Sequence, residues 1–242
     1  MSNLEITLFP CRSDNYGLLI HDKDSGQTAA IDTPDAAEIA RECKARGWTL
    51  TDIWNTHHHQ DHTGGNLTLK DSHNVTITGP DMIAGRIPGL DKGVGEGDRF
   101  LFGKHTVHVW HTPGHTKDHI IFYVPDAGAV FVGDTLFVMG CGRLFEGTPA
   151  QMRSSLAKLA ALPPETKVYC AHEYTLSNGA FAVTVEPEND DLIQAIEEAK
   201  TLREKGLPTV PTTIARELAT NPFMRAQSDA ALGDIRSAKD NF

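Results

Sequence analysis

The sequence has few cysteines, and their spacing suits neither a metal ribbon nor a disulfide framework. No C-x-x-C pair occurs, and the four cysteines lie far apart at Cys11, Cys43, Cys141 and Cys170. Zinc ribbons need closely spaced cysteine pairs, whereas small secreted domains are dense in cysteine. We therefore exclude both classes and expect a protein of the reducing cytoplasm.

Basic residues and long apolar runs are also scarce. The chain carries 22 Lys and Arg against 32 Asp and Glu, a formal net charge of −10. An acidic chain is disfavoured as a partner of nucleic acid or of an anionic membrane surface. No apolar run approaches the roughly 20 residues of a membrane span, and the first residues lack the features of a secretory signal. We expect neither nucleic acid nor membrane as a partner.

Several catalytic motifs are missing as well. The sequence contains no G-x-S-x-G nucleophile elbow and no P-loop. Residues 93–98 are rich in glycine but lack the dinucleotide-binding spacing, so we interpret them as a turn. Chemistry that depends on a serine nucleophile, a P-loop or a bound dinucleotide is therefore not indicated.

Short strands alternate with a few helices through most of the chain, and helices follow. The expected helix of the first part covers residues 36–46, and the expected strands cover residues 4–9, 16–20, 28–32, 52–55, 75–78, 100–102, 105–110, 120–124, 129–132 and 167–170. Residues 190–205, 213–219 and 228–239 are expected to be helical. These patterns predict an α/β or α+β sandwich with helices on its outer faces over residues 1–173 and a small α-helical domain over residues 174–242.

Histidine is unusually abundant, and its densest run has the pattern of metal ligands. The chain has 12 His against 3 Trp and 4 Tyr, and residues 56–66 read T-H-H-H-Q-D-H-T-G-G-N. In an extended segment His57 and His59 point to one side and His58 to the other. Asp61 and His62 follow where the chain turns into a helix, and so point elsewhere. Two imidazoles on one side and an Asp/His pair on another suit two neighbouring metal ions better than a chance surface run.

The remaining ligand candidates also follow predicted strands. His115, Asp134 and His172 come shortly after the strands that end near residues 111, 132 and 170. Strand ends at one edge of a sheet are a common place for a pocket. The candidate ligands are therefore His57, His59, Asp61, His62, His115, Asp134 and His172. His58, His111 and His119 lie near this set in sequence, and we expect them beside the metals rather than on them.

These residues and several others resemble the metallo-β-lactamase superfamily, and within it the glyoxalase II family, the hydroxyacylglutathione hydrolases. The resemblance extends along nearly the whole chain and includes the segments G-D-T-L-F (133–137), G-C-G-R-L-F-E-G (140–147), H-E-Y-T (172–175), N-P-F-M-R (221–225) and I-R-S-A-K (235–239). It implies an αββα metallo-β-lactamase-like sandwich followed by a helical C-terminal domain that contributes to glutathione binding.

The resemblance also implies roles for the candidate ligands. One divalent metal would be held by His57, His59 and His115, and a second by Asp61, His62 and His172, with Asp134 bridging them. Asp61 and Asp134 are the implied catalytic residues, acting with a metal-bridging hydroxide. Zinc is the first expectation, and iron and manganese are alternatives because imidazole and carboxylate suit all three.

Further positions match the family's glutathione-binding residues. The implied substrate-binding residues are Arg143, Phe145, Tyr174, Arg236 and Lys239. Phe145 stands where the family has tyrosine, so that hydroxyl contact is missing. Arg236 and Lys239 are three residues apart on an expected helix and therefore share a face that could clamp a carboxylate.

The implied activity is hydrolysis of S-(2-hydroxyacyl)glutathione, typically S-D-lactoylglutathione, to glutathione and D-lactate, the second step of methylglyoxal detoxification. We expect a cytoplasmic monomer. A mononuclear-iron persulfide dioxygenase with a glutathione-based substrate is the second interpretation, although it usually lacks the helical domain. A lactonase or β-lactamase-type hydrolase is third, and a non-enzymatic metal-binding or RNA-binding module is last.

Overall fold

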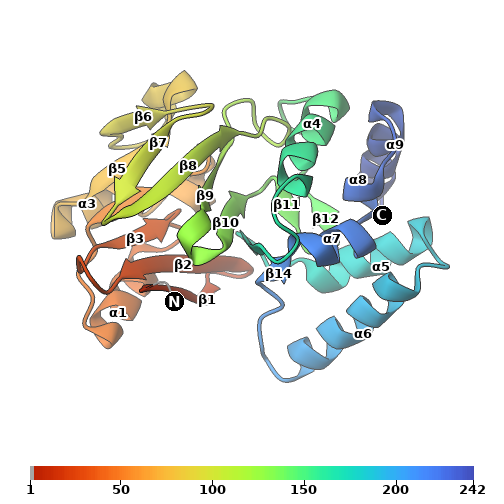
Figure 1. The fold of residues 1–242 in the computed structure, drawn as a ribbon, viewed down its shortest axis with the longest axis horizontal. Coiled ribbons are helices and arrows are strands. Elements are labelled where there is room, and N and C mark those ends of the chain that lie inside the picture. The colour runs from red at the N-terminus through yellow and green to blue at the C-terminus, as the bar shows by residue number, and fades with distance from the viewer. Residues whose placement is uncertain (1–2) are drawn as a thin grey trace. The chain divides into compact units, whose positions relative to one another are not determined.

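The computed structural model describes residues 3–242, which divide into two compact units. The first unit comprises Met1–His111 and Asp118–Gly133, and the second comprises Thr112–Lys117 and Asp134–Phe242. Figure 1 shows the strands of the first unit in red to green and the helices of the second in green to blue.

A mixed six-stranded sheet forms one half of the first unit. Its strands, in spatial order, are β1 (Leu4–Cys11), β2 (Asn15–Asp22), β3 (Thr28–Ile31), β4 (Asp52–Trp54), β5 (Thr76–Pro80) and β6 (Lys92–Val94). Strands β1 to β3 pair antiparallel, and β3 to β6 pair parallel. Because β3, β4 and β5 run in the same direction, the segments that follow them start from the same edge of the sheet.

Helices cover the connections between the parallel strands. Helix α1 (Ala36–Arg46) joins β3 to β4, and α3 (Asn66–His73) lies between β4 and β5. Asp35 accepts hydrogen bonds from the first turn of α1, and Gly47 ends the helix in the left-handed conformation. Ile39 of α1, Leu69 of α3 and Ile77 of β5 share one fully buried core cluster.

Four antiparallel strands form the other half of the first unit. They are β7 (Arg99–Phe102), β8 (His105–His111), β9 (Ile120–Val124) and β10 (Ala129–Gly133), with the 3-10 helices η1 (Asp81–Arg86) and η2 (Pro125–Ala127) in the connections. Trp54 of β4 is fully buried and lies edge-on to Phe100 and Phe102, at ring distances of 5.3 and 5.2 Å. Its indole therefore packs the first sheet against the second within this unit.

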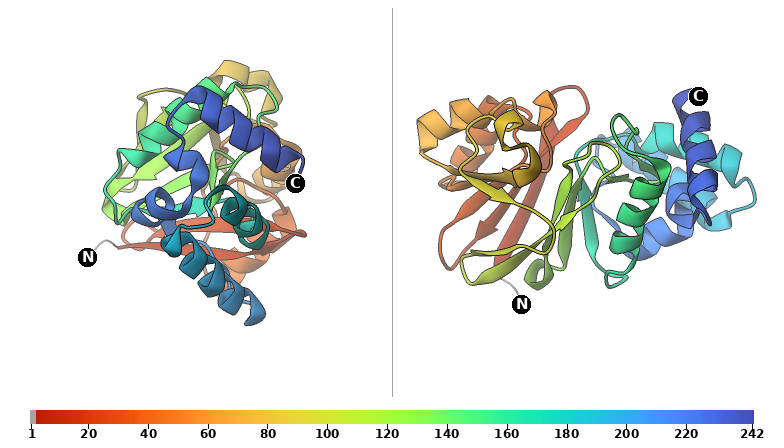
Figure 2. Two further views of the ribbon diagram at one scale, coloured as in Figure 1. Left: turned by 90° about the vertical axis from the view of Figure 1, so that its right-hand side faces the viewer. Right: turned by 90° about the horizontal axis from the view of Figure 1, so that it is seen from above.

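Helices dominate the second unit. Its strands are β11 (Leu136–Phe137) with β12 (Gly140–Cys141) and β13 (Lys167–Cys170) with β14 (Thr212–Thr213), and its helices are α4 (Pro149–Ala160), α5 (Thr175–Val185), α6 (Asp190–Glu204), α7 (Ile214–Thr220), α8 (Pro222–Arg225) and α9 (Asp229–Asp240). Helix α4 (green) lies beside α9 (dark blue) in Figure 2 and contacts it. A Thr148–Gln151 capping box starts α4.

A buried polar network ties α7 to the β11–β12 hairpin. The Asn221 amide donates to the carbonyls of Phe137 and Gly140 at 3.2 and 2.9 Å, and to the Glu217 carboxylate at 2.9 Å. Glu217 also accepts from the Met139 N–H at 2.9 Å. Burial raises the pKa of Glu217, and these donors partly offset that effect.

The predicted αββα-type fold with a helical C-terminal region is confirmed, and the predicted strands overlap observed ones. Helices α4 and α5 have no counterpart among the predicted elements. The interpretation of residues 93–98 as a turn is wrong at its start, because Gly93 and Val94 end strand β6. That short strand exists through its parallel pairing with β5, which is a long-range contact. The predicted boundary between residues 173 and 174 stays a prediction.

Across residues 3–242, each helix is too short or too polar to cross a membrane.

We predict that Asn221→Ala lowers the free energy of unfolding by about 2–3 kcal/mol, because it leaves buried carbonyls and a buried carboxylate without their donor. Denaturant unfolding measures the change. Asn241→Ala is the matched control: its amide donates only to the Ser237 carbonyl in an exposed position, so its effect should stay within about 0.5 kcal/mol. Equal effects of the two variants would contradict the role of the network.

Candidate metal centre

The first unit presents two of the predicted ligand histidines just beyond the end of β4. The Nε2 atom of His57 lies 3.0 Å from Nδ1 of His59. His57 is fully buried, and the segment is held in place by the Ile120 N–H, which donates to the Thr56 carbonyl at 2.9 Å. The two predicted ligands therefore direct ring nitrogens at one point, where a metal ion would bind both.

Helix α2 (Gln60–Thr63) carries the next pair of predicted ligands. The Oδ2 atom of Asp61 lies 3.4 Å from Nε2 of His62 and accepts from the Asn15 amide at 3.2 Å. Gly65, which follows this helix, donates its N–H to the Thr33 carbonyl at 2.8 Å. A Cβ at this position would lie 3.0 Å from that oxygen. The glycine thus allows close contact between two stretches of backbone.

Asp32 supports these histidines, and sequence reasoning missed it. Its Oδ2 atom accepts from His62 Nδ1 and from the Thr56 hydroxyl, both at 2.8 Å, while Oδ1 accepts from the Thr56 N–H at 2.8 Å. The Thr56 hydroxyl in turn accepts from His57 Nδ1 at 3.0 Å. With Nδ1 of both rings bearing the proton, the Nε2 lone pairs are left for a metal.

A sequence signal for Asp32 does exist. The residue follows β3 directly, as Asn55 follows β4, and Ile31 pairs with Trp54 in the parallel register. The segments after adjacent parallel strands leave the same edge of the sheet, so an acidic residue at that point belongs with the histidine run. Its positive φ of 60° marks a strained backbone of the kind found at functional sites.

The second unit brings the other three predicted ligands together. Asp134 lies between two histidines, with Oδ2 at 3.4 Å from His115 Nε2 and Oδ1 at 3.5 Å from His172 Nε2. All three side chains are buried. His115 Nδ1 donates to the Arg143 carbonyl at 2.8 Å, which directs its Nε2 lone pair towards the carboxylate. A carboxylate with one imidazole at each oxygen has the geometry of a bridging ligand.

The donor set fits divalent transition metals. Each unit contributes imidazole nitrogens and carboxylate oxygens, which are ligands for zinc, iron and manganese. His57, His62 and His115 each have Nδ1 engaged by a hydroxyl, carboxylate or carbonyl, as ligand histidines usually do. The structure thus assembles the predicted ligands as four in the first unit and three in the second.

Comparisons with known proteins agree on the family. A model of the metallo-beta-lactamase superfamily matches residues 23–172, and a model of the hydroxyacylglutathione hydrolase C-terminus matches residues 173–242. A hydroxyacylglutathione hydrolase of Erythrobacter litoralis is 50% identical over 99% of this chain and 100% of its own length. One of Maricaulis maris is 50% identical over 100% of both chains.

The chain belongs to the hydroxyacylglutathione hydrolase family. The resemblance that the sequence motifs carry is therefore confirmed. Among solved structures, the crystal structure of ETHE1 from Myxococcus xanthus is similar, with a TM-score of 0.74 and 28% identity over 96% of this chain and 90% of that one. This neighbour is more distant than the hydroxyacylglutathione hydrolases, which match at 50% identity.

Two further histidines adjoin the ligand histidines of this family member. His58 Nδ1 lies 3.0 Å from the buried carboxylate of Asp118, and Arg86 contacts the same ring at Nε2. The ring of His119 stacks on His57 at 4.8 Å. Both residues therefore help to hold the segment of the predicted ligands in place. Their expected position beside the metals stays a prediction.

Aromatic residues among the predicted substrate contacts lie directly on ligand histidines. The Tyr174 ring stacks on His172 at 4.8 Å with an interplanar angle of 6°. Phe145 is edge-on to His115 at 5.3 Å and is 60% exposed. Both rings belong to the second unit, so its ligands carry an aromatic surface that an organic substrate can contact.

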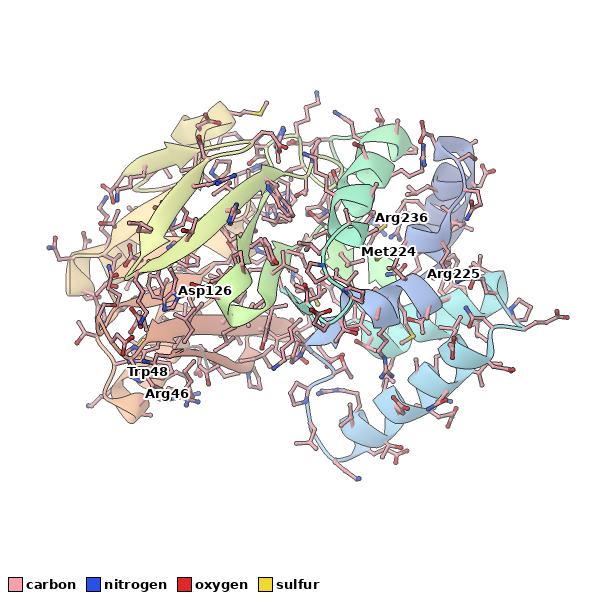
Figure 3. All side chains as sticks on the ribbon, viewed as in Figure 1. Arg46, Trp48, Asp126, Met224, Arg225 and Arg236 are labelled. Atoms are coloured by element: carbon pink, nitrogen blue, oxygen red, sulfur yellow. The ribbon has the colours of Figure 1, made fainter. Side chains whose placement is uncertain are left out.

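The basic residues predicted to bind substrate differ in accessibility. Arg236, labelled in Figure 3, is buried on α9 and donates from Nη1 to the Cys141 carbonyl at 2.8 Å. Lys239 donates to the carbonyl and hydroxyl of Ser177 at 3.0 and 3.1 Å, and partial burial lowers its pKa. Arg143 is exposed in the loop after β12. Their predicted role in binding stays a prediction.

We predict that Asp32→Asn weakens metal affinity by about 10- to 100-fold, because the ligand histidines lose a charged acceptor. Asparagine tolerates the positive φ, so the backbone is preserved. Competition with a chromophoric chelator measures the change. Asp52→Asn is the control: this part-buried aspartate lies at the start of β4, at the opposite end from the ligands, and its substitution should leave affinity unchanged. Equal metal affinities of wild type and Asp32→Asn would contradict a supporting role for Asp32.

We predict that the thiols take no part in catalysis. All four cysteines are buried, and burial raises the pKa of Cys141 to about 11 and that of Cys170 to about 12. Iodoacetamide at neutral pH should therefore label none of them in the folded protein and all of them in denaturant, as followed by intact mass. Rapid labelling with parallel loss of activity would contradict this expectation.

Proposed function

We propose that this chain hydrolyses the thioester of S-(2-hydroxyacyl)glutathione, typically S-D-lactoylglutathione, to glutathione and D-lactate, the second step of methylglyoxal detoxification. The observation that carries the proposal is the full-length match, at 50% identity, to relatives named hydroxyacylglutathione hydrolase. The donor geometry within each unit supports it, because it supplies the imidazoles and carboxylates of a metal-dependent hydrolase.

The seven predicted ligands hold two divalent metal ions in this proposal. His57, His59 and His115 would hold the first, Asp61, His62 and His172 would hold the second, and Asp134 would be shared by both. Zinc is our first assignment, with iron or manganese as alternatives. When bound, such ions lower the pKa of water to about 7, supply hydroxide at neutral pH and polarise a carbonyl.

The protein's own residues orient this chemistry. Asp32 and Thr56 fix the tautomers of the first unit's ligand histidines, and the Arg143 carbonyl fixes that of His115. Asp61 acts as ligand and orienter, with its carboxylate held by Asn15. The leaving thiol has an ordinary pKa of about 8.5, so it departs as thiolate without a dedicated general acid. No serine or cysteine nucleophile is then required.

Substrate recognition relies on aromatic and cationic groups of the second unit. Tyr174 and Phe145 flank the ligand histidines and contact the body of the thioester. Arg143, Arg236 and Lys239 supply positive charge for the carboxylates of the glutathione moiety, although the chain as a whole is acidic. A cytoplasmic monomer is the setting we infer for this activity.

We predict that removing metal abolishes thioester hydrolysis and that two equivalents of zinc per chain restore it. Metal content is measured by elemental analysis, and activity by release of free thiol. His59→Ala should lose activity by about 100-fold or more, because it deletes a ligand. His73→Ala is the control, since His73 lies at the end of α3, outside the ligand set.

Two outcomes would overturn the proposal. Full activity in the chelated protein would exclude a metal-dependent hydrolase. One iron per chain, together with oxygen consumption and no thiol release from a thioester, would favour the persulfide dioxygenase interpretation instead.

A further inference from the structure

One carboxylate oxygen joins two of the residues that the family resemblance assigns to substrate binding. The Oδ1 atom of Asp240, at the end of α9, lies 3.1 Å from Nε of Arg143 and 2.9 Å from Nη2 of Arg236. All three residues belong to the second unit. Asp240 therefore connects Arg143, in the loop after β12, to Arg236, one turn earlier on α9.

The two arginines have very different surroundings. The side chain of Arg236 is 9% exposed, with Nη1 on the Cys141 carbonyl and Nη2 on Asp240. Its guanidinium also lies 5.1 Å from the centre of the Phe223 ring. Arg236 is thus held on both terminal nitrogens by protein acceptors and has little surface for a ligand.

Arg143 has an open edge. Its side chain is 54% exposed, Nε faces Asp240, and the guanidinium carbon lies 5.9 Å from the centre of the Phe145 ring. Among the hydrogen bonds of residues 3–242, none involves Nη1 or Nη2 of Arg143. The two terminal nitrogens of a guanidinium form a fork that binds a carboxylate in bidentate fashion.

The open fork lies close to the ligand histidines of the same unit. Phe145, which carries the Arg143 guanidinium on its face, is itself edge-on to His115 at 5.3 Å. The Arg143 carbonyl also accepts from His115 Nδ1. A carboxylate held by this fork therefore belongs to a substrate whose reacting group reaches the ligand histidines.

We propose that Asp240 is a positioning residue that sets specificity for a thioester whose thiol part carries a carboxylate. Asp240 fixes the guanidinium of Arg143 through Nε, so that the terminal nitrogens are ready for the substrate, and Arg236 anchors Asp240. This inference rests on the proposed function and changes one assignment within it. Arg143 contacts the substrate carboxylate, whereas Arg236 acts through Asp240.

The charge of Asp240 has an opposite effect that the experiment must separate. A carboxylate beside the binding site repels the substrate carboxylate, so its removal would strengthen binding if repulsion dominated. Orientation dominates in this geometry, because two guanidinium groups already neutralise Asp240 and because an unrestrained arginine loses much side-chain freedom on binding.

The test compares two thioesters of the same acid. One is S-D-lactoylglutathione, and the other is the lactoyl thioester of N-acetylcysteamine, a thiol without a carboxylate. We expect Asp240→Ala to raise the ratio of the first KM to the second by about fivefold, since Nε of Arg143 loses its acceptor and the guanidinium is no longer held in place. Asp240→Asn keeps an acceptor oxygen and should change the ratio by less than about twofold.

Asp229→Ala is the matched control. Asp229 lies at the start of the same helix and pairs with Arg153, so this variant removes one negative charge and one arginine partner from α9 away from the site. It should leave the KM ratio at the wild-type value. Bound metal, measured in every variant, should stay constant, because Asp240 is not a ligand in the proposed set.

The outcomes separate the two proposals. If wild type hydrolyses neither thioester, the proposed function fails. If wild type hydrolyses both and Asp240→Ala lowers the KM ratio or leaves it unchanged, the positioning role of Asp240 fails while the function stands. A rise of the ratio that is equal in Asp240→Ala and Asp240→Asn would also overturn it, because the charge rather than the acceptor would then be responsible.

Discussion

Hydrogen bonds from Thr56 and His62 to the Asp32 carboxylate are the constraint on which the ligand geometry of the first unit depends. They satisfy a buried carboxylate, fix the tautomer of His62 and, through the Thr56 hydroxyl, that of His57. The sheet makes this possible because β3 and β4 are parallel neighbours, so Asp32 and the histidine run leave the same edge. A buried carboxylate without these donors would be costly, and with them it becomes a rigid support for two metal ligands.

In the second unit, a backbone carbonyl and a buried side-chain amide hold the predicted ligands and the segment next to them. His115 is oriented by the Arg143 carbonyl, and the β11–β12 hairpin that follows Asp134 is held by Asn221 and Glu217. That hairpin places Phe137 edge-on to His172 at 5.9 Å. The helical part of the chain thus does more than add substrate contacts, because its buried polar groups fix the segment next to a predicted bridging ligand.

The ligand run and most strands were predictable because their signals are local. Histidines two apart after a strand, a helix start at Asp61 and the alternation of apolar residues need no knowledge of distant partners. Strand β6 and the supporting residues Asp32, Glu217 and Asp240 depend instead on long-range contacts, with partners 14 to 97 positions away in the sequence. Asp32 does have a signal in the sequence, because it directly follows a strand parallel to the one before the histidine run. Glu217 and Asp240 carry no sign of their partners, so their roles required the fold.

In a protein of net charge −10, the cationic residues of the second unit give a reason for a carboxylate beside the site that we propose for an anionic substrate. Arg143, Arg236 and Lys239 repel one another, and the pKa of Lys239 is lowered by burial and further by the charge of Arg236, whereas Asp240 raises it. Asp240, which pairs with both arginines, therefore favours the charged form of Lys239 and fixes the geometry of the two guanidinium groups. It contacts Nε of the Arg143 guanidinium, which leaves Nη1 and Nη2 for the carboxylate of the substrate that we propose, so in this proposal a negative residue makes the site better suited to a negative ligand.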